Sequence, residues 1–98
     1  MKKSLYLAFV AMLVAGCADT KLIPAPTAEM ALKSGQNLET LGRGHTVYIT
    51  ACARCHEPMM PSEISGEEWH VVVPGMSWNA GISDEDEQAV MKYIMAAR

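Results

Sequence analysis

The spacing of apolar residues predicts an amphipathic helix that leads into a cysteine at position 52. Small or apolar side chains recur there every three or four positions, so they share one face of a helix. The residues of this face are Leu41, Gly44, Val47, Tyr48 and Cys52. A second helix is expected after Ser83, a good N-cap, because the next four residues are acidic and suit the first turn of a helix. The apolar face of this second helix consists of Val90, Tyr93, Ile94 and Ala97.

Between these two helices, Ser65 and Glu68 have the spacing of a capping box, which predicts another helix start. The apolar face of this helix consists of Trp69, Val72 and Val73. We expect the helix to cover about residues 66–73, because Pro74 disfavours the helical conformation of the residue before it. No segment has the alternating pattern of a strand. The fold class is therefore predicted to be all-α, with about three helices.

The chain begins with two lysines, followed by an apolar stretch over residues 5–15. These eleven residues are too few for a membrane-spanning helix, which needs about twenty, but they suit the apolar part of a secretory signal peptide. The stretch ends in Val-Ala-Gly-Cys, which resembles the lipobox of bacterial lipoproteins. The resemblance implies that Cys17 is lipidated and becomes the first residue of the mature chain. An ordinary signal peptide that happens to precede a cysteine is the alternative.

We therefore divide the chain into a signal peptide (1–16), a lipidated cysteine with a tether (17–36) and one small domain (37–98). Without the signal peptide the chain keeps six basic and eleven acidic side chains, a formal charge of −5. This balance does not fit a nucleic-acid-binding protein. The protein is expected to be exported and anchored by lipid, facing the periplasm. By resemblance to enterobacterial sorting rules, Ala18 after the cysteine favours the outer over the inner membrane.

The segment Cys52-Ala53-Arg54-Cys55-His56 contains the C-x-x-C-H string of c-type haem attachment. Two thiols three positions apart lie on about one helical turn, so both can add to the vinyl groups on one edge of a haem. His56 then stands beside the iron as its axial ligand. The three cysteines are all used in this scheme, one for the lipid and two for the thioethers. The sequence thus predicts one covalent haem c.

Other cysteine chemistries fit the sequence less well. A zinc site could use Cys52, Cys55 and His56 with His70 or His45, but structural zinc usually comes with a second paired knuckle. We expect both of the latter histidines at the surface instead. A thioredoxin-like redox pair needs a βαβ context, which this chain lacks. A disulfide between cysteines three positions apart would constrain almost nothing.

The pattern from Gly44 to the haem motif reads G-x-x-x-Y-x-x-x-C-x-x-C-H and resembles the N-terminal helix of class I cytochromes c. Residues 61–94 also resemble small members of this family, in the order Pro-Ser, Trp, Val-Val, Met, Ala-Gly-Ile and an acidic helix start. The resemblance covers about residues 38–97. It implies a cytochrome c-like fold in which the C-terminal helix crosses the first helix near Gly44, with Tyr93 packed against it. It also implies that a proline carbonyl, here that of Pro61, accepts a hydrogen bond from the axial histidine.

Met76 is our candidate for the second axial ligand of the iron. It lies twenty residues beyond His56, which lets the chain pass around the haem edge. Met59 and Met60 follow the histidine so closely that the chain spans at most ~14 Å, which is short for reaching the opposite haem face. These two methionines, His70 and a site with no second protein ligand are the alternatives. The remaining methionines, which we expect to fill the core, are Met30, Met91 and Met95.

His/Met coordination leaves no open position on the iron and favours its ferrous form. The sequence therefore predicts a one-electron carrier rather than an enzyme. Its expected partners are a redox donor and acceptor and the membrane, through Cys17. Membership of a larger oxidoreductase is left open. If Met76 does not bind, an open sixth site could sense a gaseous ligand or reduce peroxide.

Overall fold

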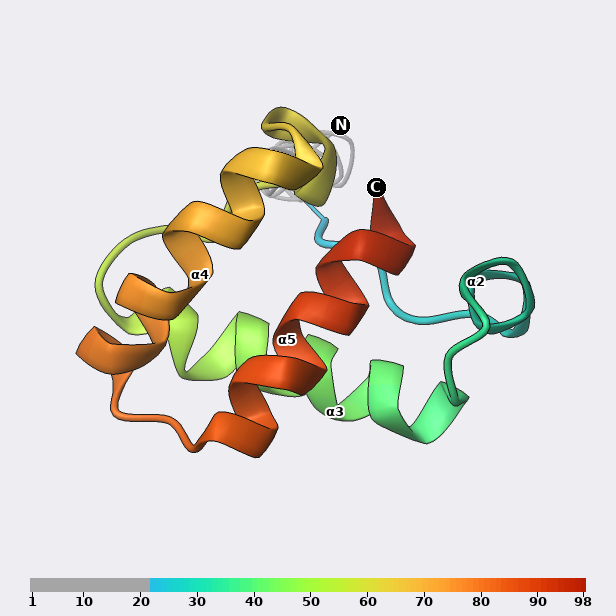
Figure 1. Ribbon diagram of the computed structural model, residues 1–98, viewed down its shortest axis with the longest axis horizontal. Helices are drawn as coiled ribbons and strands as arrows, with labels where there is room; N and C mark the ends of the chain where they lie inside the picture. Colours follow the sequence, from blue (N-terminus) through green and yellow to red (C-terminus); the bar gives the residue numbers. More distant parts are fainter. Residues whose placement is uncertain (1–21) are drawn as a thin grey trace, which may run out of the picture.

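The computed structural model describes residues 22–98, in which helices are joined by short loops (Figure 1). This part contains no strand, and its α-helices are α2 (Ala28–Ser34), α3 (Leu38–Thr50), α4 (Gly66–Ala80) and α5 (Asp84–Ala97). Two short 3-10 helices, η1 (Cys52–Arg54) and η2 (Pro61–Glu63), lie between α3 and α4. The predicted all-α class is confirmed for this part. The expected signal peptide and Cys17 lie outside the described residues. Among the residues from 22 onward, no helix has the length and apolar character required to span a membrane.

Helices α3 and α5 cross closely at Gly44, and Figure 1 shows α5 passing across α3. A Cβ atom added to Gly44 would lie 2.6 Å from the carbonyl carbon of Ala89 and 2.8 Å from the Cβ atom of Tyr93. The backbone of α5 can approach this closely only because residue 44 has no side chain. Tyr93 is fully buried beside the crossing. The expected crossing near Gly44, with Tyr93 packed against the first helix, is confirmed.

Helix α5 begins as its sequence predicts. The Ser83 hydroxyl accepts a hydrogen bond from the Asp86 backbone N–H at 3.2 Å, which satisfies one of the free donors at the helix start. Arg43 of α3 then binds the acidic first turn. Its Nε lies 2.6 Å from an Asp86 carboxylate oxygen, and its Nη2 lies 3.8 Å from a Glu85 carboxylate oxygen. These contacts join α5 to α3 on the solvent side of their crossing.

Helix α4 begins with the predicted capping box, in which the Ser65 hydroxyl accepts from the Glu68 N–H at 3.1 Å. The expected end at residue 73 is wrong, because the helix continues through Pro74 to Ala80. It ends where Gly81 takes the left-handed conformation at φ 68°. The N–H groups of Gly81 and Ile82 then bond the Trp78 and Ser77 carbonyls, which forms a Schellman motif.

Packing explains why the proline does not end α4. The buried residues of this helix are Trp69, Val73 and Ser77, which recur every four positions on one face. Their burial against the rest of the domain outweighs the one hydrogen bond that Pro74 cannot donate. Pro74 itself is exposed, so its ring displaces no core residue.

The segment before α3 is more ordered than a tether. Thr27 caps α2 by accepting a hydrogen bond from the Met30 N–H at 3.1 Å. Met30 and Ile23 pack against the core, and the Tyr93 hydroxyl donates a hydrogen bond to the Pro24 carbonyl. Leu22 remains 84% exposed. The expected tether over residues 17–36 therefore includes a helix and contacts that belong to the folded domain.

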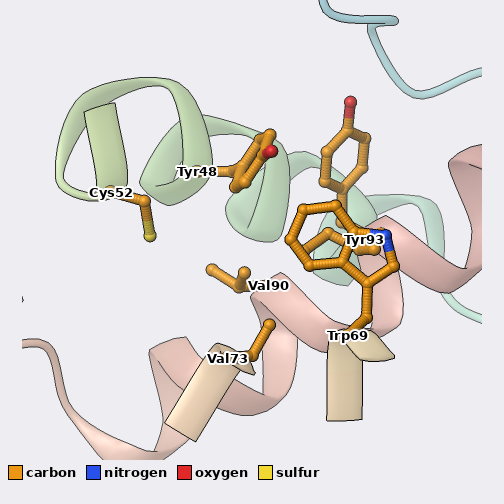
Figure 2. Close-up of a cluster of buried hydrophobic side chains, with 7 residues drawn as sticks. Tyr48, Cys52, Trp69, Val73, Val90 and Tyr93 are labelled. Atoms are coloured by element: carbon orange, nitrogen blue, oxygen red, sulfur yellow. The ribbon is translucent and has the colours of Figure 1, made fainter. Parts of the chain in front are cut away.

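The core is a single cluster that joins α3, α4 and α5 (Figure 2). Its buried members are Tyr48, Cys52, Trp69, Val73, Val90, Tyr93 and Ile94. Tyr48 and Trp69 meet edge to face, with their ring centroids 6.2 Å apart. Cys52 stands at one end of the cluster, where α3 gives way to η1. The core thus leads directly to the cysteine motif.

Candidate functional site

The two cysteines of the C-x-x-C-H motif have different surroundings. Cys52 is 8% exposed and belongs to the core cluster, whereas Cys55 is exposed. Burial raises the pKa of the Cys52 thiol, an effect that the nearby Arg54 guanidinium partly offsets. The motif begins in η1, directly after α3, so the same helix that carries the core fixes the first thiol. The sequence predicted this junction but not the difference in exposure between the cysteines.

His56 is exposed, and its ring is oriented by its own neighbour. The Nδ1 atom lies 2.9 Å from the Glu57 carbonyl oxygen. A carbonyl can only accept, so Nδ1 donates, and the neutral form of the imidazole then presents the lone pair of Nε2. A histidine that binds a metal through Nε2 usually holds its other ring N–H in this way. The imidazole is thus oriented as a metal ligand requires.

The structure brings Met76 to the cysteine motif. A pocket of about 100 Å³ is lined by Cys52, Cys55, His56, Met76, Asn79 and Ala80. Met76 is partly buried and packs against the core cluster. Because α4 continues past Pro74, Met76 lies on a helix rather than in the turn that the sequence predicted. Asn79 and Ala80 follow it at helical spacing. They were not predicted as pocket residues, because the helix was expected to end earlier.

The chemical types of the donor groups around this pocket match those that hold a c-type haem. They comprise two thiols, an imidazole nitrogen and a thioether sulfur, which are the groups that form thioether links and bind iron. The pocket volume of about 100 Å³ is small beside the ~300–1,000 Å³ of ordinary cofactor pockets. A porphyrin would therefore have to widen this pocket. Within residues 22–98, no three His, Cys, Asp or Glu side chains lie together as a metal site of the zinc type requires.

The loop after His56 is held by two aromatic side chains of the core. The Tyr48 hydroxyl donates a hydrogen bond to the Met59 carbonyl, and the Trp69 indole N–H donates one to the Pro61 carbonyl at 2.8 Å. Both bonds fix the backbone at the edge of the pocket. The Pro61 carbonyl is therefore bonded to Trp69 rather than to His56, whose partner is the next residue in the chain.

The other residues that the sequence offered as ligands lie outside this pocket. Met59 packs against the core and Met60 is partly buried in the same loop. His70 is exposed, as expected. The expectation that His45 faces solvent is wrong, because its ring packs edge to face on Tyr93 with the centroids 5.1 Å apart and is only partly exposed. The sequence could not show this contact, since it depends on how α5 crosses α3.

Comparison of the chain with protein-family models, with curated proteins and with solved structures finds no match in any of the three. The chemistry of the site must therefore be argued from its own residues. The decisive observation is that Cys52, Cys55, His56 and Met76 line one pocket, although Met76 lies twenty residues beyond His56 in the sequence.

Proposed function

We propose that this protein is a small monohaem cytochrome of the class I type, which carries single electrons through one covalently attached haem c. The observation that carries this proposal is the convergence of the C-x-x-C-H motif and Met76 on one pocket. The all-helical fold and the close α3–α5 crossing at Gly44 support it, because the resemblance to class I cytochromes c implies both.

Four of the residues that line the pocket have a specific role in this proposal. Cys52 and Cys55 hold the haem through thioether bonds to its vinyl groups. His56 binds the iron through Nε2, with its ring held by the Glu57 carbonyl. Met76 would bind the iron as a second protein ligand through its sulfur. The bound group would supply one-electron exchange between ferric and ferrous iron.

The chain's own residues then explain why electron transfer is the whole activity. With His56 and Met76 both bound to the iron, no ligand position would remain for a substrate. Cys55 and His56 are exposed, which keeps this edge of the site close to the surface and to a redox partner. The acidic charge of the mature chain favours a partner with a positive docking patch. A lipid on Cys17 would hold the domain on the periplasmic side of a membrane, by preference the outer one, near its donor and acceptor.

Optical spectra of the exported protein test the axial ligands. We expect sharp bands in the ferrous state and, in the ferric state, the weak far-red band of methionine–iron coordination. Met76→Leu should abolish the far-red band and give high-spin ferric iron, whereas the matched variant Met60→Leu should keep the band. A wild-type spectrum that is already high-spin would support the open sixth site, with gas sensing or peroxide reduction. Absence of a Soret band would refute haem binding altogether and favour a non-haem role such as a zinc scaffold.

A further inference from the structure

A second hollow lies away from the cysteine pocket and shares no residue with it. Its volume is about 410 Å³, and it is lined by Ser34, Gln36, His70, Met91, Lys92, Met95 and Ala96. Three of these residues, His70 of α4 and Met91 and Met95 of α5, carry neutral nitrogen or sulfur donors. None of these three residues lines the cysteine pocket, and of the three only Met91 packs against the core cluster.

His70 is oriented like a metal ligand. Its Nδ1 lies 2.7 Å from the Gly66 carbonyl oxygen, one helical turn earlier in α4. Since the carbonyl can only accept, Nδ1 donates, and the neutral form of the ring presents the lone pair of Nε2. Metal-binding histidines are typically held by such a bond from the other ring nitrogen. The side chain is exposed, so this nitrogen is accessible to an ion in the hollow.

Two methionines of α5 line the same hollow as this histidine. Met91 and Met95 are four residues apart on α5, so they project from the same face of the helix. Met95 lies against Gly66, the residue that holds His70, because a Cβ atom on Gly66 would be 3.5 Å from the Met95 sulfur. Met95 is 40% exposed, and Met91 is partly buried against the core. The three donors thus border the same hollow from two helices.

We propose that His70, Met91 and Met95 form a binding site for a soft monovalent metal ion, Cu(I) or its surrogate Ag(I). Thioether sulfur and imidazole are ligands that Cu(I) prefers, whereas hard divalent cations prefer carboxylates, none of which lines this hollow. Two cationic side chains are also close. Lys92 lines the hollow, and an Arg98 guanidinium nitrogen lies 3.4 Å from the position of a Gly66 Cβ atom. These positive charges repel a divalent ion more strongly than a monovalent one. The ion binds without a change of oxidation state.

Methionine-methyl ¹³C NMR of the full chain, titrated with Ag(I), tests this site residue by residue. In protein whose thiols have been blocked by alkylation, the methyl signals of Met91 and Met95 should shift together and saturate at one equivalent, while those of Met30 stay unchanged. His70→Gln should weaken Ag(I) binding at these methyls about tenfold or more, by analogy with the loss of other metal-supporting residues. The matched variant His45→Gln, which alters a histidine outside the hollow, should leave the affinity unchanged.

The same spectra separate this proposal from the haem proposal, on which it does not depend. Met76 lines the cysteine pocket, so an ion captured there would shift its methyl signal instead. Shifts confined to that pocket, an absence of any shift, or Ag(I) binding that is unaffected by His70→Gln would overturn the assignment. Competition against a Cu(I) chelator under reducing conditions should give the same ranking of variants.

Discussion

Replacing Gly44 by alanine tests the helix crossing on which the domain depends. The new Cβ atom would lie 2.6 Å from the Ala89 carbonyl carbon and 2.8 Å from the Tyr93 Cβ atom, both too close for real contacts. The nearest atoms belong to the backbone of α5, which cannot rotate away as a side chain could. The two helices must therefore separate and loosen the buried cluster around Tyr93.

The magnitude follows from two opposing effects. Overpacking a tight site costs roughly 1–3 kcal/mol, and the rigid neighbour places Gly44→Ala at the upper end. Alanine recovers about 1 kcal/mol of helix propensity relative to glycine. We therefore expect a net loss of about 2 kcal/mol in the free energy of unfolding. For a domain of this size that loss corresponds to a Tm lower by roughly 8–16 °C.

Gly42→Ala is a matched control in the same helix. No atom lies within 4 Å of a Cβ atom at Gly42, so only the propensity gain remains. We expect this variant to be more stable than the wild type by up to about 1 kcal/mol. Thermal unfolding followed by circular dichroism at the helical band compares the three proteins. Equal Tm values for Gly44→Ala and Gly42→Ala would refute the close approach of α3 and α5.

Three further predictions concern α4 and α5. Pro74→Ala should raise the free energy of unfolding, measured by urea titration, by about 1 kcal/mol or more, because it restores a hydrogen bond inside α4. An unchanged free energy of unfolding would mean that the helix ends before Pro74. Ser65→Ala should lower the free energy of unfolding by about 1 kcal/mol through loss of the capping box with Glu68, whereas Ser62→Ala, at an exposed position, should change it little. Burial raises the pKa of Tyr93 from 10.0 to about 12, so the folded state favours the neutral phenol. The resulting contribution of Tyr93 to the free energy of unfolding is fully present below pH 10 and is lost as the pH rises towards 12. The Tm of the wild type should therefore fall between pH 10 and 12 by more than the Tm of Tyr93→Phe, and equal falls would contradict this assignment.

The parts of the fold that were predictable from the sequence depend on local chemistry. Ser83 and Ser65 satisfy free N–H groups within three residues of themselves, so a capping pattern shows where α5 and α4 begin. The role of Gly44 as the crossing point of two helices was predictable only from its position beside the haem motif. The resemblance to class I cytochromes c implies the C-terminal helix that crosses there. The presence of Cys52, Cys55 and His56 at one site was predictable because the three residues lie within five positions of the chain.

The features that the sequence did not reveal depend on contacts between distant residues. Pro74 is a helix breaker by local rules, and the packing of Met76 against the core and the Gly81 cap keep α4 intact beyond it. Helix α2 has only seven residues and depends on packing against α3 and α5, which a short sequence window cannot show. The bond from Trp69 to the Pro61 carbonyl likewise requires the folded loop.

Covalent haem attachment is tested most directly by the intact mass of the exported protein after extraction with acidic organic solvent. We predict a mass increased by one haem that the solvent does not remove, and an unmodified, colourless chain for the variant in which Cys52 and Cys55 are both serine. A wild-type chain whose mass lacks the haem increment relative to that variant, with Cys52 and Cys55 still open to alkylation under denaturing conditions, would contradict the proposed function.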